Sequence, residues 1–191
     1  MSTEKEAFAH HEAGHAVVAM LQGMQVRSIS VERTNDSGGE TDLQEIGMPI
    51  EELGQIVEDG RRPTACEIII LEQHVRMSLA GEIAQFHFAP KSVHDFHASF
   101  DMKFLEFLNR IAGSEREVNA WTELLRIQTE LLINRHWKMI EAIATALLDR
   151  ERLTGDEALE VLRTTPDHHG SIFPGNLSQG LEIERRFRVP R

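Results

Sequence analysis

Hydrophobic and histidine positions near the start of the chain recur every three or four residues. Between residues 3 and 22, the positions that share one broad face are Phe8, His11, His15, Val18 and Leu21. Residues at this spacing lie on the same side of an α-helix, so the pattern predicts an amphipathic helix. Ser2 or Thr3 is the expected N-cap, and Gly23 is the expected stop.

The next segment changes from helical to alternating periodicity. Residues 26–33 (Val-Arg-Ser-Ile-Ser-Val-Glu-Arg) alternate between apolar and polar side chains, which is typical of a half-buried strand. A turn cluster at residues 35–39 (Asn-Asp-Ser-Gly-Gly) follows, and residues 40–43 are expected to return as a second short strand. The two strands predict a small hairpin near the N-terminus.

Helical periodicity dominates the remainder of the chain. The expected helices cover a short segment at 50–57, then 64–88, 98–112, and 114–148 with a break near residues 136–137. Pro90 ends the second of these. Thr154 and Glu157 form a capping-box pattern that starts a last helix ending near Arg163.

These elements predict a mainly α (α+β) fold with a small N-terminal β-sheet or hairpin. Residues 1–165 are expected to form one domain, since the 191-residue chain has enough apolar content for one core. Residues 166–191 contain proline, glycine and several arginines with little periodic apolar content, and they predict a flexible C-terminal tail.

The amino-acid composition argues against several classes of binding partner. Thirty-one acidic residues against 20 basic ones give a formal net charge of -11, which argues against partners with anionic surfaces such as nucleic acid and membranes. The sequence shows no apolar stretch long enough to span a bilayer and no secretory signal at its start. The single cysteine, Cys66, is expected to be a buried filler in an apolar run, and the chain is expected to be cytoplasmic.

The segment His11-Glu12-Ala13-Gly14-His15 carries the clearest chemistry. Two histidines four residues apart stack on one helical face and can reach one zinc ion. Glu12 is offset from His11 by about 100° around the helix axis, so it flanks that ion and suits the role of general base. The alternative is an ordinary helix that happens to carry two histidines.

Two neighbouring residues add to this picture. A glycine inside a helix costs roughly 1 kcal/mol relative to alanine, so Gly14 predicts close approach by another element. His10 is expected to point away from the face that carries His11 and His15, and to be exposed.

The helix around His11-Glu12-Ala13-Gly14-His15 resembles the zinc helix of the FtsH-type (AAA-linked membrane) metalloproteases. The resemblance continues through residues 29–33, 39–41, 78–84 and 98–101, and through stretches between 134 and 157. It implies a helical zinc peptidase domain with one zinc ion, whose third ligand matches Asp101. It also implies that a strand at Gly39, Glu40 and Thr41 lines the substrate cleft.

The residues themselves leave alternatives open. His94, Asp95 and His97 lie near Asp101 in the sequence, and Glu82 lies on a helix from which thermolysin-like enzymes draw a glutamate ligand. Cobalt or manganese can occupy similar ligand sets. The edge at residues 39–41 could accept an extended peptide through backbone hydrogen bonds, or be an ordinary hairpin edge.

The chain departs from the family in lacking a phosphate-binding Gly-x-x-x-x-Gly-Lys-[Ser/Thr] loop, so it has no ATPase motif of its own. The expected activity is therefore ATP-independent hydrolysis of peptides or unstructured protein segments. A homo-oligomer and a separate ATPase partner stay open. The competing hypothesis is a catalytically inactive or regulatory zinc-binding protein of the same fold.

Overall fold

The computed structural model describes residues 4–32, 40–44, 54–56, 58–92 and 108–165. Within them the protein is mainly helical with one small three-stranded antiparallel sheet, which confirms the predicted fold class. The helices whose bounds are described are α1 (Glu4–Leu21), α3 (Ala65–Phe88), α5 (Glu115–Arg135), α6 (Trp137–Arg150) and α7 (Gly155–Thr164), and residues 54–56 and 108–111 are also helical. The strands are β1 (Gln25–Ser30), β2 (Glu40–Gln44) and β3 (Arg152–Thr154). None of the described helices is both long enough and apolar enough to cross a membrane.

The sheet has the order β2-β1-β3, with β1 in the centre. Ile29 of β1 lies opposite Thr41 on one side and Leu153 on the other. The β1–β2 pairing confirms the predicted return strand. Sequence reasoning missed β3 because three residues between two helices are too few to show alternation.

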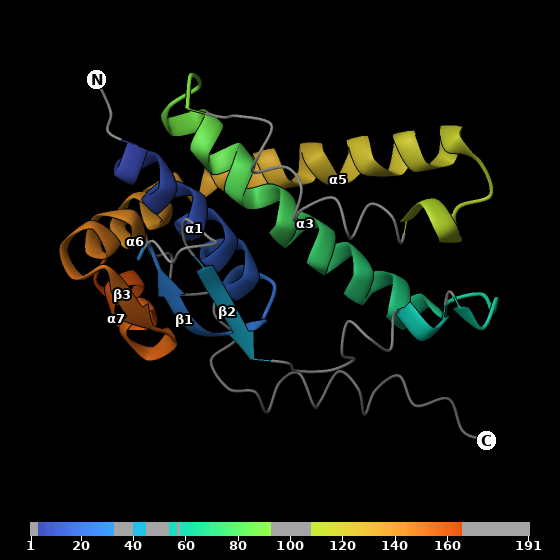
Figure 1. Cartoon of the computed structure of the whole chain (residues 1–191), viewed down its shortest axis with the longest axis horizontal. Coiled ribbons are helices and arrows are strands. Elements are labelled where there is room, and N and C mark those ends of the chain that lie inside the picture. Colours follow the sequence, from blue (N-terminus) through green and yellow to red (C-terminus); the bar gives the residue numbers. More distant parts are fainter. Residues whose placement is uncertain (1–3, 33–39, 45–53, 57, 93–107, 166–191) are drawn as a thin grey trace.

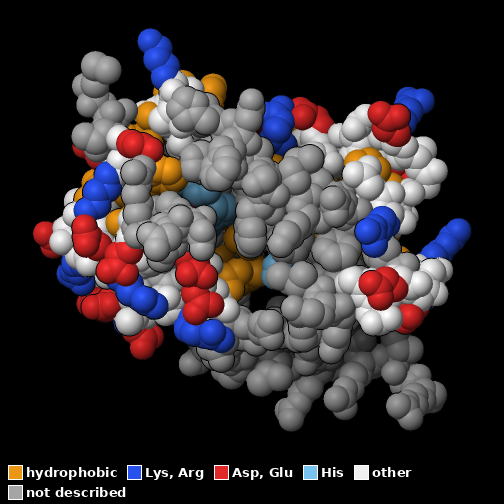
Figure 2. Space-filling model, viewed as in Figure 1, with side chains coloured by type: hydrophobic (Ala, Val, Ile, Leu, Met, Phe, Trp, Pro, Cys, Tyr) orange, Lys and Arg blue, Asp and Glu red, His pale blue; other side chains and the backbone are white. Residues whose placement is uncertain are grey.

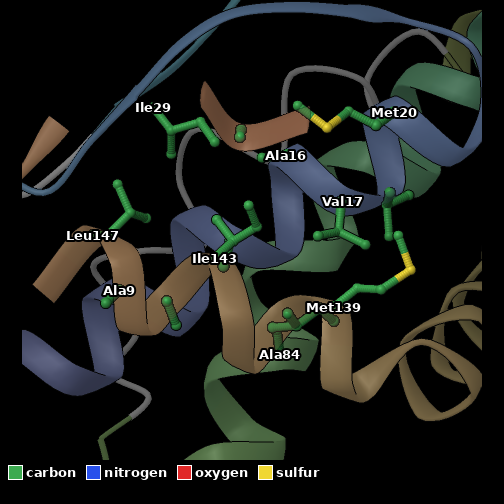
Figure 3. Close-up of a cluster of buried hydrophobic side chains, with 14 of the residues drawn as sticks. Ala9, Ala16, Val17, Met20, Ile29, Ala84, Met139, Ile143 and Leu147 are labelled. Carbon is green, nitrogen blue, oxygen red and sulfur yellow. The ribbon is translucent and has the colours of Figure 1, made fainter. Parts of the chain in front are cut away.

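Helix α1 lies between α3 and α6, with the sheet alongside (Figure 1). The main core forms where these elements meet, and Figure 3 shows Val17 of α1, Ala84 of α3 and Ile143 of α6 among its side chains. Small residues on α1, such as Ala9, Ala13 and Ala16, are fully buried there. Their size allows neighbouring helices to approach α1 closely.

Two predicted helix boundaries are confirmed, the break near residue 136 and the start of the last helix at Thr154. The long region after Ser114 breaks at His136, which separates α5 from α6. The capping box at the start of α7 is present, since the Thr154 side chain accepts from the Glu157 N–H and the Glu157 carboxylate accepts from the Thr154 N–H.

Cys66, at the start of α3, is exposed, so the prediction that it is a buried filler was wrong. Phe86, near the end of the same helix, is exposed as well. For Phe86 the reason is that α3 turns its small residues Ala80, Gly81 and Ala84 toward the interior. Phe86 therefore points outward, 57% exposed.

His10 is also placed differently from the prediction, because it is buried rather than exposed. Its ring stacks on Phe88, with ring centroids 3.7 Å apart and an angle of 9° between the planes. Trp137 of α6 stacks on it as well, with a centroid distance of 5.6 Å. His10 thus contributes to the packing of α1 against α3 and α6.

Candidate metal centre

His11 and His15 lie on successive turns of α1 and point toward the same place. Their Nε2 atoms are 3.0 Å apart, and the two rings meet edge to face with an angle of 78° between their planes. His11 is buried and His15 is partly buried. Figure 2 shows histidine side chains near the centre of one face of the molecule, next to hydrophobic side chains, with most charged side chains toward the edge.

Helix α3 orients both rings through their other nitrogens. The Nδ1 atom of His11 lies 3.0 Å from Oε1 of Gln85, and Nδ1 of His15 lies 2.7 Å from the carbonyl oxygen of Met77. Both partners are acceptors, so each Nδ1 is the protonated nitrogen and each Nε2 carries the lone pair. This is the tautomer in which Nε2 can bind a metal.

The two histidines fit α3 only because that helix has a glycine opposite them. A Cβ atom on Gly81 would lie 2.7 Å from Nε2 of His11 and still closer to Nε2 of His15. Gly14 of α1 is equally crowded, since a Cβ there would lie 2.6 Å from the carbonyl oxygen of Ala80 and 2.7 Å from Cβ of Ala84. The close approach that Gly14 predicted is therefore confirmed.

Glu12 is buried beside the pair and contacts the sheet. Its Oε2 atom accepts a hydrogen bond from Oγ1 of Thr41 on β2, at 2.8 Å. Burial raises the pKa of Glu12 to about 7, the Thr41 bond opposes this rise, and the nearby charge of Glu40 adds to it. A cation beside the carboxylate would lower that pKa again.

Burial also lowers the pKa of His15, although its bond to the Met77 carbonyl opposes the shift. The neutral imidazole is therefore favoured. That is the form of histidine that ligates metal ions.

The arrangement of the two rings fits a shared cation. Two nitrogens that each lie about 2.0–2.1 Å from one tetrahedral zinc are roughly 3.3 Å apart. The observed Nε2–Nε2 distance of 3.0 Å is close to that value. Two lone pairs at this distance repel each other, and a cation that both bind would convert that repulsion into attraction.

The described residues contain only part of the predicted site. Asp101 lies outside them, as do Gly39 and the alternative ligands His94, Asp95 and His97. Across the described ranges, no group of three or more histidine, cysteine, aspartate and glutamate side chains is placed to hold a metal ion. Glu82, the alternative ligand on α3, therefore does not complete a set with the histidine pair.

The two remaining predicted residues, Glu40 and Thr41, begin β2, an outer strand of the sheet. Both were expected to bind substrate. Thr41 also has a contact that sequence reasoning did not foresee, the hydrogen bond to Glu12.

Sequence reasoning also missed Gln85, which is buried on α3 and contacts His11. The only signal in the sequence was a polar residue next to apolar ones, between Ala84 and Phe86. Glutamine is mostly exposed in folded proteins, so this pattern did not predict a contact with a metal ligand.

No protein-family model matches the chain, and no curated protein matches it significantly. The functional assignment must therefore come from the chemistry of the site.

Proposed function

We propose that this chain is a zinc-dependent metalloendopeptidase. In this proposal His11, His15 and Asp101 bind one zinc ion and Glu12 is the catalytic base. The observation that carries the proposal is the buried pair of imidazoles, whose Nε2 atoms lie 3.0 Å apart while both Nδ1 atoms are bonded to acceptors on α3. Glu12 lies one residue from His11 on the same helix, as a base for this reaction would need to.

Bound zinc would polarise the scissile carbonyl and make water acidic enough to lose a proton near neutral pH. Glu12 would accept the proton of the attacking water and deliver it to the nitrogen of the leaving amine. The hydrogen bond from Thr41 fixes one carboxylate oxygen of Glu12. The second oxygen would then be the one that accepts the proton of the water.

The outer strand β2 supports a peptide as the substrate. One edge of β2 pairs with β1, and within the described sheet its other edge has no neighbouring strand. An extended peptide could add to that edge through backbone hydrogen bonds. Because Thr41 of β2 contacts Glu12, a peptide bound there would pass close to the base.

Extended peptides and unstructured segments are the proposed substrates, because only an extended chain can pair with a strand edge. The sequence has no ATP-binding loop, so hydrolysis should not need ATP. A separate ATPase partner would extend the substrates to folded proteins. The proposal includes a cytoplasmic location, which the single cysteine favours.

Elemental analysis and peptide hydrolysis test the proposal together. Wild-type protein should contain about one zinc per chain, as a three-ligand catalytic site requires, and should cleave a diverse peptide library without ATP. Glu12→Gln should retain zinc and lose hydrolysis, whereas Asp101→Ala should lose zinc. Equal turnover by wild type and Glu12→Gln would reject the catalytic role and favour a regulatory zinc-binding protein.

A further inference from the structure

Gln85 connects the proposed metal ligand His11 to the end of α3. Its Oε1 atom accepts the hydrogen bond from Nδ1 of His11 at 3.0 Å. Its Nε2 atom donates to Ser92, at 2.8 Å from the carbonyl oxygen and 3.2 Å from Oγ. The Gln85 side chain is 2% exposed, so water does not compete strongly for these bonds.

We propose that Gln85 is a positioning residue that fixes the metal-binding tautomer of His11 and thereby sets the zinc affinity of the site. This inference rests on the proposed function, because it needs His11 to be a zinc ligand. It extends that function by naming a residue that acts on zinc through another side chain.

The contacts at Ser92 decide which way the amide points. The carbonyl oxygen of Ser92 can only accept a hydrogen bond, so the NH₂ group of Gln85 must face it. The oxygen of the amide then faces His11 and can only accept from Nδ1. A proton on Nδ1 leaves Nε2 of His11 as the nitrogen that can bind a metal.

The neutral amide also has an electrostatic consequence. A carboxylate at this position would draw the Nδ1 proton more strongly and make Nε2 a better donor to a cation. An apolar side chain of similar size would leave the tautomer unset. If Gln85 positions His11, Gln85→Glu should bind zinc at least as tightly as wild type does. Gln85→Met should bind zinc more weakly than both.

A purely structural role predicts the opposite order. If Gln85 only fills space, Gln85→Met keeps the volume and the zinc affinity, because Met adapts well to packed sites. Gln85→Glu would then weaken zinc binding, since it places a charge in a buried position and removes the donor to Ser92. The two variants thus distinguish the two roles.

The experiment measures zinc affinity by competition with a chromophoric chelator, for wild type and both variants. Gln85→Met should bind zinc about 10- to 100-fold more weakly than wild type. The matched control is Thr129→Val on α5, which also removes the hydrogen bond of a buried polar side chain and should leave zinc affinity unchanged. If Gln85→Met does not fold, Gln85→Glu decides alone, and binding weaker than wild type overturns the proposal.

A second readout follows the tautomer directly. In zinc-free wild type, ¹⁵N chemical shifts of His11 should show the proton on Nδ1, and Gln85→Met should show a mixture of tautomers. An unchanged tautomer in Gln85→Met overturns the proposal. Variant-dependent zinc binding without peptide hydrolysis in any form would reject the proposed peptidase and leave the role of Gln85 intact. A wild-type chain that binds no zinc rejects both.

Discussion

Gly81 of α3 lies directly against the imidazole of His15, so closely that a single methyl group would overlap the ring. The missing side chain is what lets the histidine pair lie between α1 and α3. Helix packing and the proposed metal centre therefore share one requirement, a small residue at this crossing.

Gly81→Ala should weaken zinc binding strongly, because the added methyl displaces the Nε2 atoms of His11 and His15. Since those atoms end side chains that can move, the free energy of unfolding without zinc should change less than in Gly14→Ala. There the methyl meets the backbone carbonyl of Ala80, and the expected loss is about 1–3 kcal/mol. Zinc titration and urea denaturation of both variants check this. Equal zinc affinity in Gly81→Ala and wild type would contradict the shared site.

Thr41→Val removes the hydrogen bond to Glu12 while keeping the shape of the side chain. Hydrogen bonds to charged groups contribute about 1.5–3 kcal/mol, so kcat should fall about 10- to 100-fold while zinc content stays unchanged. Thr41→Ser retains the hydroxyl and is the control, with activity near wild type. Steady-state peptide hydrolysis measures both. If Thr41→Ser loses as much activity as Thr41→Val, the hydroxyl is not responsible.

Zinc should stabilise the folded chain. A ligand that binds only the folded state raises the free energy of unfolding by about 2.7 kcal/mol when its free concentration is one hundred times its Kd. For a chain of this length, each kcal/mol should raise Tm by about 2–4 °C. Thermal melts with zinc and with a chelator should show the difference in wild type. His11→Ala and His15→Ala should abolish it, whereas His87→Ala, which changes an exposed residue on α3, should keep it. An equal zinc effect in His11→Ala would remove that residue from the site.

Acid should destabilise the start of α3 through Glu67. The Arg61 guanidinium and the Thr64 N–H hold the pKa of Glu67 at about 2, below its ordinary value of 4.5. Because the folded state lowers this pKa, the contribution to stability is complete above about pH 4.5 and is lost as pH falls toward 2.

When the pH is lowered from 7 to 3, the urea concentration at the unfolding midpoint should therefore decrease more for wild type than for Glu67→Gln. Arg61→Gln should remove part of this extra decrease at low pH. A double-mutant cycle of Arg61→Gln and Glu67→Gln measures the interaction energy of the ion pair. Parallel pH curves for wild type and Glu67→Gln would show that the carboxylate does not contribute.

The sequence predicted those structural features that depend on interactions between residues close together in the chain. The helix that carries His11 and His15, the return strand at Thr41 and the start of α7 at Thr154 all follow from periodicity and caps. The burial of His10 could not be predicted, because Phe88 and Trp137 lie far away in the sequence. The partners Gln85 and Met77 were missed for the same reason, since they depend on how α3 crosses α1.

The antiparallel pairing of β3 with β1 has a consequence for the order of events on the ribosome. Ile29 meets Leu153 only after the chain has emerged past that residue, and α1 packs against α6, whose last residue is Arg150. The two imidazoles lie at positions 11 and 15, whereas α3, which contacts both Nδ1 atoms, begins at Ala65, and α6, on the other side of α1, begins only at Trp137. A nascent chain should therefore complete the packing around the histidine pair only after Leu153 has emerged, so that the proposed metal site forms well after its two histidines have been made.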